Sequence, residues 1–254
     1  MLSEAFTSKV VLVTGASAGI GRATALAFAK QGAKVLVTDI AVAEGEATVN
    51  MIKERGGDAA FVETDVTREA HAERAVRKAV ELYGRLDCAV NNAGIDGEVT
   101  LTVECTKENW DRVIAINLTG VFLGMKHQIP QMLKQGGGAI VNTASTLGLV
   151  GHQNVPAYVA SKHGVIGLTK STALAYAKAN IRVNSVCPGV TMTAMLEPFR
   201  LTDPQSYEAV TSGTPMGRPA EPEEVANAIM WLCSDASSYC NGHALVVDGG
   251  YTVS

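Results

Sequence analysis

The chain has 254 residues, of which 47% are hydrophobic and 18% are charged. This length suits a single α/β domain with a core large enough to fold without disulfides. Its 21 basic and 25 acidic residues give a formal net charge of −4, which argues against a nucleic-acid-binding protein.

The first residues and the cysteines predict a cytoplasmic protein without a metal site. Met1 to Ser8 lack the basic and apolar regions of a secretory signal. No run approaches the roughly 18 apolar residues of a membrane-spanning helix, so no membrane partner is expected. The five cysteines are odd in number and include no Cys-x-x-Cys pair, so we expect reduced thiols rather than disulfides or metal ligands.

Short apolar runs are expected to form the strands. They are rich in valine and isoleucine, and most do not alternate with polar residues, which is typical of strands buried on both faces. Segments with helical periodicity lie between the early runs. This alternation predicts one domain over residues 1–254, an α/β fold with a doubly wound, seven-stranded parallel sheet of the Rossmann type. In chain order the runs are Val10–Val13, Lys34–Thr38, Ala59–Glu63, Leu86–Val90, Ala139–Val141, Ile181–Val186 and Ala244–Val247.

A glycine-rich turn follows the first run directly. Its sequence is Thr14-Gly15-Ala16-Ser17-Ala18-Gly19-Ile20-Gly21, and a helical segment comes next. In this position the first glycine permits a tight turn, and the second lets a diphosphate approach the helix N-terminus. The third allows close contact between helix and strand. The turn therefore predicts a dinucleotide-binding site.

Asp39 ends the second run and favours NAD over NADP. It lies near the position, about 20 residues after the first glycine, at which dinucleotide-binding folds read the ribose. A carboxylate there accepts hydrogen bonds from the adenosine ribose hydroxyls and repels a 2′-phosphate. Neither Ala18 nor Ile40 is a basic residue that could neutralise such a phosphate.

Further motifs, together with the glycine turn, resemble those of the short-chain dehydrogenase/reductase superfamily. Asn91-Asn92-Ala93-Gly94 follows the fourth run, and Tyr158-Val159-Ala160-Ser161-Lys162 supplies a Tyr-x-x-x-Lys. Ser145 precedes that tyrosine at the family's spacing, Asn117 lies in Asn-Leu-Thr-Gly, and Pro188-Gly189 follows the sixth run. The resemblance spans about residues 8 to 252. It implies an oxidoreductase with Asn117, Ser145, Tyr158 and Lys162 as catalytic residues.

The chemistry of hydride transfer explains these residue types. A proton must move on the substrate oxygen, and a tyrosine with a pKa near 10 is too weakly ionised to act as a base at neutral pH. Lys162 follows Tyr158 by one helical turn, so its charge is expected to lower that pKa, as is the positive nicotinamide of the oxidised cofactor. Ser145 is expected to stabilise developing charge on the same oxygen. The resemblance implies that Asn117 anchors a water molecule in a proton relay.

The resemblance also implies which residues contact NAD. Asp65 and Val66 are expected to seat the adenine, and Val190 and Thr193 to hold the nicotinamide carboxamide. Thr14 and Asn92 are expected to brace the turn. The complete expected set is Gly15, Ser17, Gly19, Ile20, Gly21, Asp39, Ile40, Asp65, Val66, Asn91, Ala93, Gly94, Tyr158, Lys162, Pro188, Gly189, Val190 and Thr193.

The substrate is expected to bind beneath a lid at about residues 190–218, where the regular pattern breaks down. Asp96 and Glu98 either add polarity at the rim of this site or lie in a solvated loop. No lysine or arginine occurs in residues 147–155, which favours a neutral, moderately apolar secondary alcohol or ketone, including a cyclic one. The expected lining comprises Met192, Met195, Leu196 and Phe199, with Leu147 and Gln153 on the opposite wall.

Two alternative functions stay open. An NADPH-dependent 3-oxoacyl reductase of fatty-acid synthesis shares the same motifs, although Asp39 argues against it. A catalytically silent dinucleotide sensor is disfavoured because Asn117, Ser145, Tyr158 and Lys162 are all present. The resemblance further implies a homotetramer.

Overall fold

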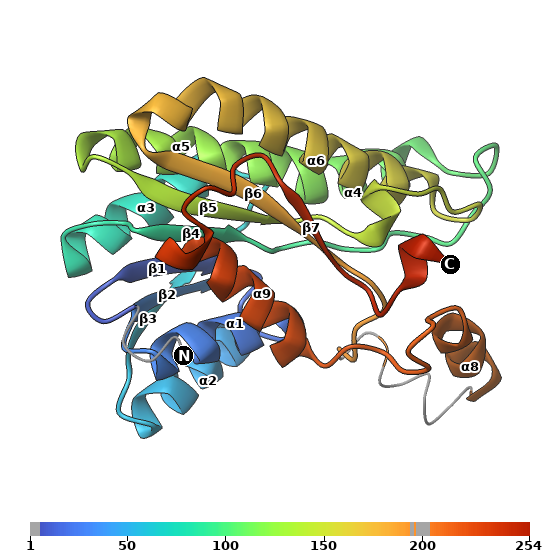
Figure 1. Ribbon diagram of the computed structural model, residues 1–254, viewed down its shortest axis with the longest axis horizontal. Coiled ribbons are helices and arrows are strands. Elements are labelled where there is room, and N and C mark those ends of the chain that lie inside the picture. Colours follow the sequence, from blue (N-terminus) through green and yellow to red (C-terminus); the bar gives the residue numbers. More distant parts are fainter. Residues whose placement is uncertain (1–5, 194–195, 197–203) are drawn as a thin grey trace.

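A parallel sheet forms the centre of the computed structural model, which describes residues 6–193, 196 and 204–254. In the described chain it has seven strands in the order β3-β2-β1-β4-β5-β6-β7 (Figure 1). Each apolar run of the sequence forms one of them, so the predicted sheet is confirmed. The strands are β1 (Val10–Thr14), β2 (Lys34–Asp39), β3 (Asp58–Glu63), β4 (Cys88–Asn91), β5 (Gly138–Thr143), β6 (Ile181–Pro188) and β7 (Ala244–Val247).

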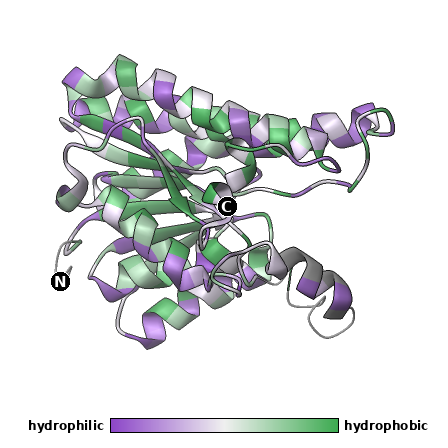
Figure 2. Cartoon of the chain, turned by 45° about the vertical axis from the view of Figure 1, so that its right-hand side comes forward, coloured by the Kyte–Doolittle hydropathy of each residue, from purple (hydrophilic) through white to green (hydrophobic). Residues whose placement is uncertain are grey.

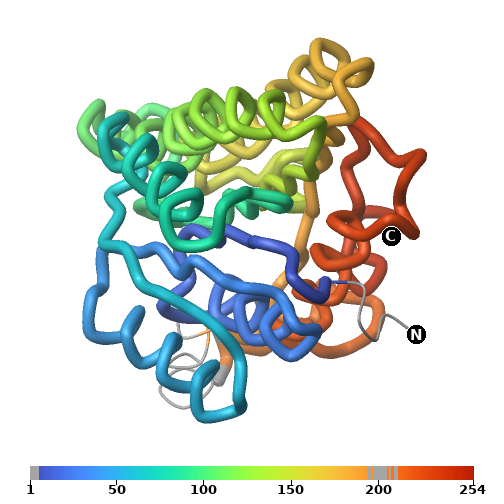
Figure 3. Tube along the Cα trace, turned by 90° about the vertical axis from the view of Figure 1, so that its left-hand side faces the viewer, coloured from blue at the N-terminus to red at the C-terminus, as the bar shows by residue number. Residues whose placement is uncertain are grey.

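Helices cover both faces of the sheet, as the doubly wound fold requires (Figures 1 and 3). Helices α1, α2 and α9 contribute to the buried cluster on one face, and α3, α5 and α6 contribute to the cluster on the other. In the described chain no helix is long and apolar enough to cross a membrane. The helices are α1 (Gly19–Lys30), α2 (Val42–Glu54), α3 (Glu69–Tyr83), α4 (Lys107–Ile114), α5 (Gly120–Lys134), α6 (Pro156–Tyr176), α8 (Pro204–Ser212) and α9 (Pro222–Cys233).

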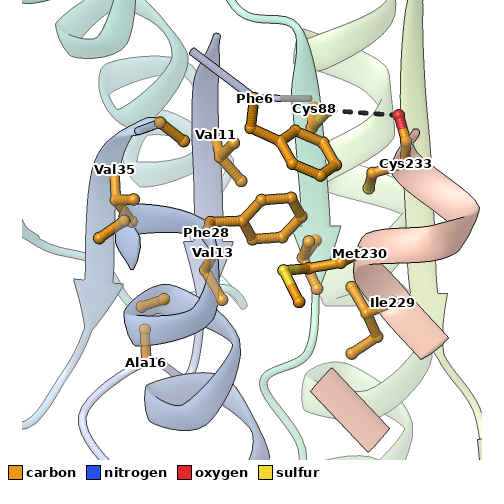
Figure 4. Close-up of a cluster of buried hydrophobic side chains, with 14 of the residues drawn as sticks. Phe6, Val11, Val13, Ala16, Phe28, Val35, Cys88, Ile229, Met230 and Cys233 are labelled. Carbon is orange, nitrogen blue, oxygen red and sulfur yellow. Dashed lines mark hydrogen bonds between the residues drawn. The ribbon is translucent and has the colours of Figure 1, made fainter. Parts of the chain in front are cut away.

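Alternating side chains of each strand supply both cores. In β1, Val11 and Val13 pack with α1 and α9, whereas Val10 and Leu12 belong to the opposite cluster. Phe28 of α1 lies against Phe6 in an edge-to-face contact with ring centroids 4.8 Å apart (Figure 4). Hydropathy follows the same division, because the strands are mainly hydrophobic and the outer faces of the helices carry hydrophilic residues (Figure 2). Each fully buried large apolar side chain stabilises this arrangement by about 1.5–3 kcal/mol.

The strand order places the candidate site at one edge of the sheet. β1 lies between β2 and β4. After β1 the chain adds strands towards the β3 edge of the sheet, and after β4 it adds strands towards the β7 edge. Ligands of such sheets bind beyond the carboxyl ends of the strands, at the point where the order reverses. Thr14, Asp39, Asn91, Thr143 and Pro188 end their strands at this edge.

Candidate active site

The glycine turn is held by hydrogen bonds from the loop after β4. The Thr14 hydroxyl oxygen accepts from the backbone N–H groups of Asn92 and Ala93 at 2.9 and 3.1 Å. The Asn92 side chain donates to the Thr14 carbonyl oxygen at 3.1 Å. Gly15 and Gly19 have positive φ values of 64° and 51°, a conformation that favours glycine. Thr14 and Asn92 thus brace the turn in the way the sequence suggests.

Gly21 lies where the first helix meets this turn, and there is no space for a side chain. A Cβ atom at this position would overlap the carbonyl oxygen of Gly15 and would lie 2.7 Å from Nδ2 of Asn92. Gly21 is absent from the described lining of the cavities, so its role is to allow the turn to pack against the helix.

Replacing Gly21 with alanine is expected to weaken binding of a reduced nicotinamide dinucleotide about tenfold or more, because overpacking by one methyl group costs about 1–3 kcal/mol and distorts the glycine turn. Fluorescence titration with NADH measures this loss. Gly151→Ala is the matched control, since no atom lies within 4 Å of a Cβ built there. Equal affinities for the two variants would contradict the assignment of the turn.

A cavity of about 350 Å³ opens beside the turn. Asp39 lies in its wall, and three donors fix the carboxylate: the Ser17 hydroxyl at 2.6 Å, the Ser17 N–H at 3.0 Å and the Ala41 N–H at 3.0 Å. A carboxylate has about four acceptor positions, so these bonds leave capacity for a ligand. The described lining comprises Gly15, Ser17, Ala18, Gly19, Ile20, Asp39, Ile40, Thr64, Asp65, Val66, Asn92, Ala93, Gly94, Ile95, Ile116 and Thr193.

Asp65 reaches this cavity as an ionised side chain. Its Oδ1 atom accepts hydrogen bonds from the Thr67 hydroxyl at 2.7 Å and the Thr67 N–H at 2.9 Å. The hydroxyl contact holds the pKa of Asp65 below its usual value, against the effect of burial. This carboxylate can therefore accept from an amine donor such as the exocyclic group of adenine.

Asn91, like Gly21, does not line either cavity in the described chain, whereas the other residues expected to contact NAD do. Its side chain donates to Oδ1 of Asn142 at 2.9 Å and accepts from Nε2 of Gln128 at 2.8 Å. It is buried and absent from the described lining of both cavities. The sequence motif could not distinguish a cavity-facing amide from one that joins β4 to β5 and α5 in the core.

A second cavity, of about 480 Å³, continues from the first. The two share Ile20, Asn92, Gly94, Ile95 and Thr193, so one elongated ligand could occupy both. This cavity contains the predicted reaction centre. Its remaining described lining is Asp96, Val99, Thr143, Ala144, Ser145, Tyr158, Lys162, Pro188, Gly189, Val190, Thr191 and Leu196.

Tyr158 and Lys162 face this second cavity from the same side of α6. Nζ of Lys162 lies 5.4 Å from the centroid of the Tyr158 ring and donates to the Thr143 carbonyl oxygen at 2.9 Å. Thr143 was not expected among the site residues, although it ends the strand that leads to Ser145. The Ser145 hydroxyl oxygen accepts from the Leu147 N–H at 3.1 Å, which fixes it at the end of β5.

The pKa of Tyr158 differs from the sequence-based expectation. Burial raises it to about 12, with a further increase from Asp96 that outweighs the lowering by the Ser145 hydrogen bond. Burial lowers the pKa of Lys162 to about 8, and Asp96 opposes this shift. Burial is thus the main cause of both shifts, and the lowering of the Tyr158 pKa that we expected from the charge of Lys162 is not seen in the protein alone.

Asn117 lies in a π-helical turn, Ala115–Thr119, that joins α4 to α5. Such turns are frequent at functional sites. Its amide nitrogen donates to the Ile95 carbonyl oxygen at 2.8 Å, and its amide oxygen accepts from the Ile95 N–H at 2.9 Å. The amide nitrogen also lies 3.2 Å from the Ser161 hydroxyl oxygen. The side chain is thus buried and positions the loop after β4, rather than facing the described part of either cavity.

The expected substrate residues are less well placed than the catalytic ones. Leu147, Gln153 and Met192 are absent from the described lining of the second cavity, and Gln153 is exposed. Met195 and Phe199 lie outside the described residues. Leu196 does line the cavity, together with Val99 and Thr191, which the sequence did not single out. Val99 stands in an irregular loop, so no periodic pattern could have indicated its position.

Comparison with known proteins agrees with this geometry. A family model described as "Enoyl-(Acyl carrier protein) reductase" matches residues 15–252. The chain is 45% identical over 252 residues to cyclohexanol dehydrogenase of Acinetobacter sp. (strain SE19), which covers 99% of this chain and 98% of that protein.

Solved structures show the same fold. The crystal structure of levodione reductase superposes with a TM-score of 0.94 at 38% identity, covering 98% of this chain and 99% of that one. A protein of Agrobacterium tumefaciens, assigned as a 2-deoxy-D-gluconate 3-dehydrogenase and crystallised with bound NADP, gives a TM-score of 0.90 at 33% identity, covering 99% of both chains. Proteins of this fold thus include at least one that binds NADP.

Proposed function

The chain belongs to the short-chain dehydrogenase/reductase family, and on that premise we propose that it is an NAD-dependent oxidoreductase acting on a neutral secondary alcohol or the corresponding ketone. One observation carries the proposal. Tyr158, Lys162 and Ser145 line a cavity that is continuous with the cavity beside the glycine turn.

The residues present fit a dinucleotide. The glycine turn leaves backbone N–H groups and the start of α1 open to a diphosphate, with no acidic residue in the first turn of that helix. Gly94 borders both cavities, and a Cβ atom built there would lie 3.3 Å from Oδ1 of Asn117 and 3.5 Å from Nζ of Lys162. Bound NAD supplies the acceptor or donor for the hydride.

In this proposal two side chains contact the oxygen of the substrate, and two others support them. Tyr158 accepts the hydroxyl proton during oxidation and returns it during reduction. Ser145 donates a hydrogen bond to the same oxygen and stabilises the charge that develops on it. Lys162, fixed by Thr143, favours the tyrosinate form through its charge. Asn117 is proposed to maintain the proton path, and its contacts to Ile95 support a positioning role.

The proposal of NAD rather than NADP is supported by Asp39. Its carboxylate is fixed in the wall of the first cavity, beside Ile40, and no basic side chain occurs in the described lining there. A 2′-phosphate bound next to this carboxylate would lack a neutralising partner.

The proposed substrate class is supported by the second cavity and by the relatives. Val99, Val190 and Leu196 give its described part an apolar wall suited to a ring. Cyclohexanol dehydrogenase, a relative over nearly the whole chain, is named for a cyclic secondary alcohol. A 3-oxoacyl reductase is the second candidate, favoured by a relative in Thermotoga maritima that is named 3-oxoacyl-[acyl-carrier-protein] reductase and is 43% identical over 248 residues.

A panel of secondary alcohols tests this proposal directly. We expect NADH to form with cyclohexanol and related cyclic alcohols, and much less reduced cofactor to form when NADP replaces NAD. Reduction of a 3-oxoacyl thioester with NADPH in preference to these reactions would instead support the acyl reductase. Tight NADH binding without turnover of any substrate would support the dinucleotide sensor.

A cytoplasmic homotetramer completes the proposal. Leu174 of α6 is 84% exposed, and Val246 of the edge strand β7 is 37% exposed. Apolar side chains at an exposed helix and at a sheet edge suit contact between subunits. Light scattering of the purified protein measures the oligomeric state.

A further inference from the structure

Asp96 places a carboxylate in the wall of the second cavity. The residue belongs to the loop after β4, and Asn117 holds that loop through the backbone of Ile95. In the described part of the lining, Asp96 and Lys162 are the only charged side chains. They are therefore the two groups that a charged substrate would meet there.

Lys162 and Asp96 differ in their hydrogen-bond partners within the protein. Nζ of Lys162 donates to Thr143, and the residue is only 3% exposed. Among the described residues, no hydrogen-bond donor or cation pairs with the carboxylate of Asp96, which is accessible from the cavity. The acceptor positions of Asp96 are thus free for a ligand, whereas one of the three donors of the Lys162 ammonium group is already engaged by Thr143.

The charge of Asp96 acts within the reaction centre. Burial raises the pKa of Asp96, and the charge of Lys162 opposes that shift. Asp96 in turn raises the pKa of Tyr158 and of Lys162. Asp96 is exposed to solvent on one side, so part of its charge is screened. A negative charge on a substrate placed directly beside Asp96 would still be disfavoured.

We propose that Asp96 determines the charge of the substrate: its carboxylate accepts a hydrogen bond from a hydroxyl remote from the reacting carbon and excludes substrates that carry a carboxylate. The inferred substrates are neutral cyclic diols and hydroxyketones. This inference rests on the proposed function, because it specifies the substrate class of the same site.

Turnover of two probe alcohols tests the proposal. The probes are cyclohexane-1,4-diol and 4-hydroxycyclohexanecarboxylate, which share a ring and differ in charge. We expect Asp96→Asn to lower the ratio of kcat/KM for the diol to that for the carboxylate by about tenfold, because asparagine keeps the shape and an acceptor but removes the charge. An unchanged ratio would overturn the proposal.

Glu98→Gln is the matched control on the same loop. Glu98 is absent from the described cavity lining, and its carboxylate lies 4.0 Å from Arg112. The variant removes one negative charge near the site without changing the cavity wall, so the ratio should remain that of the unmodified protein. If Glu98→Gln lowers the ratio as much as Asp96→Asn, the general charge of the loop explains the selectivity and Asp96 does not.

A binding measurement separates this inference from the proposed function. Cyclohexanecarboxamide and cyclohexanecarboxylate are titrated into the protein saturated with NADH, and heat release gives each Kd. We expect the neutral amide to bind about tenfold more tightly, and Asp96→Asn to remove the difference. A tighter Kd for the amide would support the role of Asp96 even if the protein oxidised no alcohol. Equal affinities in the unmodified protein would overturn that role even if the protein oxidised cyclohexanol.

Discussion

Replacing Tyr158 with phenylalanine is expected to lower kcat for alcohol oxidation by about a thousandfold, the loss typical of removing a general acid/base. Phenylalanine keeps the ring beside Lys162 but removes the hydroxyl group that is proposed to exchange a proton with the substrate oxygen. Steady-state formation of NADH measures the loss. Binding of NADH should persist, because the glycine turn and Asp39 are unchanged.

Tyr176→Phe is the control for this variant. Tyr176 lies at the end of the same helix, far along α6 from the cavity, and is only partly buried. Its hydroxyl is absent from the described site, so turnover should remain unchanged. Full activity of Tyr158→Phe would contradict the proposed acid/base role. Loss of NADH binding in that variant would show that the hydroxyl acts on the cofactor instead.

Replacing Asp39 with alanine is expected to lower the ratio of kcat/KM for NAD to that for NADP by about a hundredfold. The change removes the carboxylate that Ser17 and Ala41 hold in the wall of the first cavity. Hydrogen bonds from a ribose to a charged group contribute about 1.5–3 kcal/mol. The same change removes the repulsion of a 2′-phosphate, so both effects act in one direction. Initial rates with each dinucleotide and cyclohexanol give the ratio.

Glu63→Ala provides the comparison for Asp39. Glu63 pairs with Asp39 in the register of β2 and β3, yet it is exposed and absent from the described lining. The Glu63→Ala substitution therefore removes a negative charge from the same edge of the sheet without altering the cavity wall. We expect Glu63→Ala to change the ratio of kcat/KM for NAD to that for NADP much less than Asp39→Ala does. An Asp39→Ala enzyme that keeps the original preference would show that other residues select the cofactor.

The sheet could be predicted from the sequence because each strand is a short apolar run, and the five inner strands are buried on both faces. The edge strands β3 and β7 are only partly buried. The glycine turn could also be predicted, since its role depends on the backbone geometry between two adjacent elements. Tyr158 and Lys162 share a cavity because residues one helical turn apart lie on one side of a helix. These features depend on local spacing, which the sequence displays directly.

Other features depend on packing between distant segments. Asn91 joins Gln128 and Asn142 in the core, a contact that the motif itself does not reveal. The effect of burial on the pKa of Tyr158 depends on every element around α6. Val99 lines the cavity from an irregular loop, and Gln153 does not, although both stand near predicted site residues. The spacing of residues along the chain could not have distinguished these outcomes.

Transfer of deuterium from labelled cyclohexanol tests the central claim most directly. The alcohol carries deuterium on the carbon that bears the hydroxyl, and the reduced cofactor is analysed by mass spectrometry after incubation with the protein and NAD. We expect one deuterium atom in the nicotinamide ring of NADH, together with unlabelled cyclohexanone, and a much slower reaction for Tyr158→Phe. Formation of cyclohexanone with unlabelled NADH, or no reaction with any secondary alcohol tested, would contradict the proposed hydride transfer.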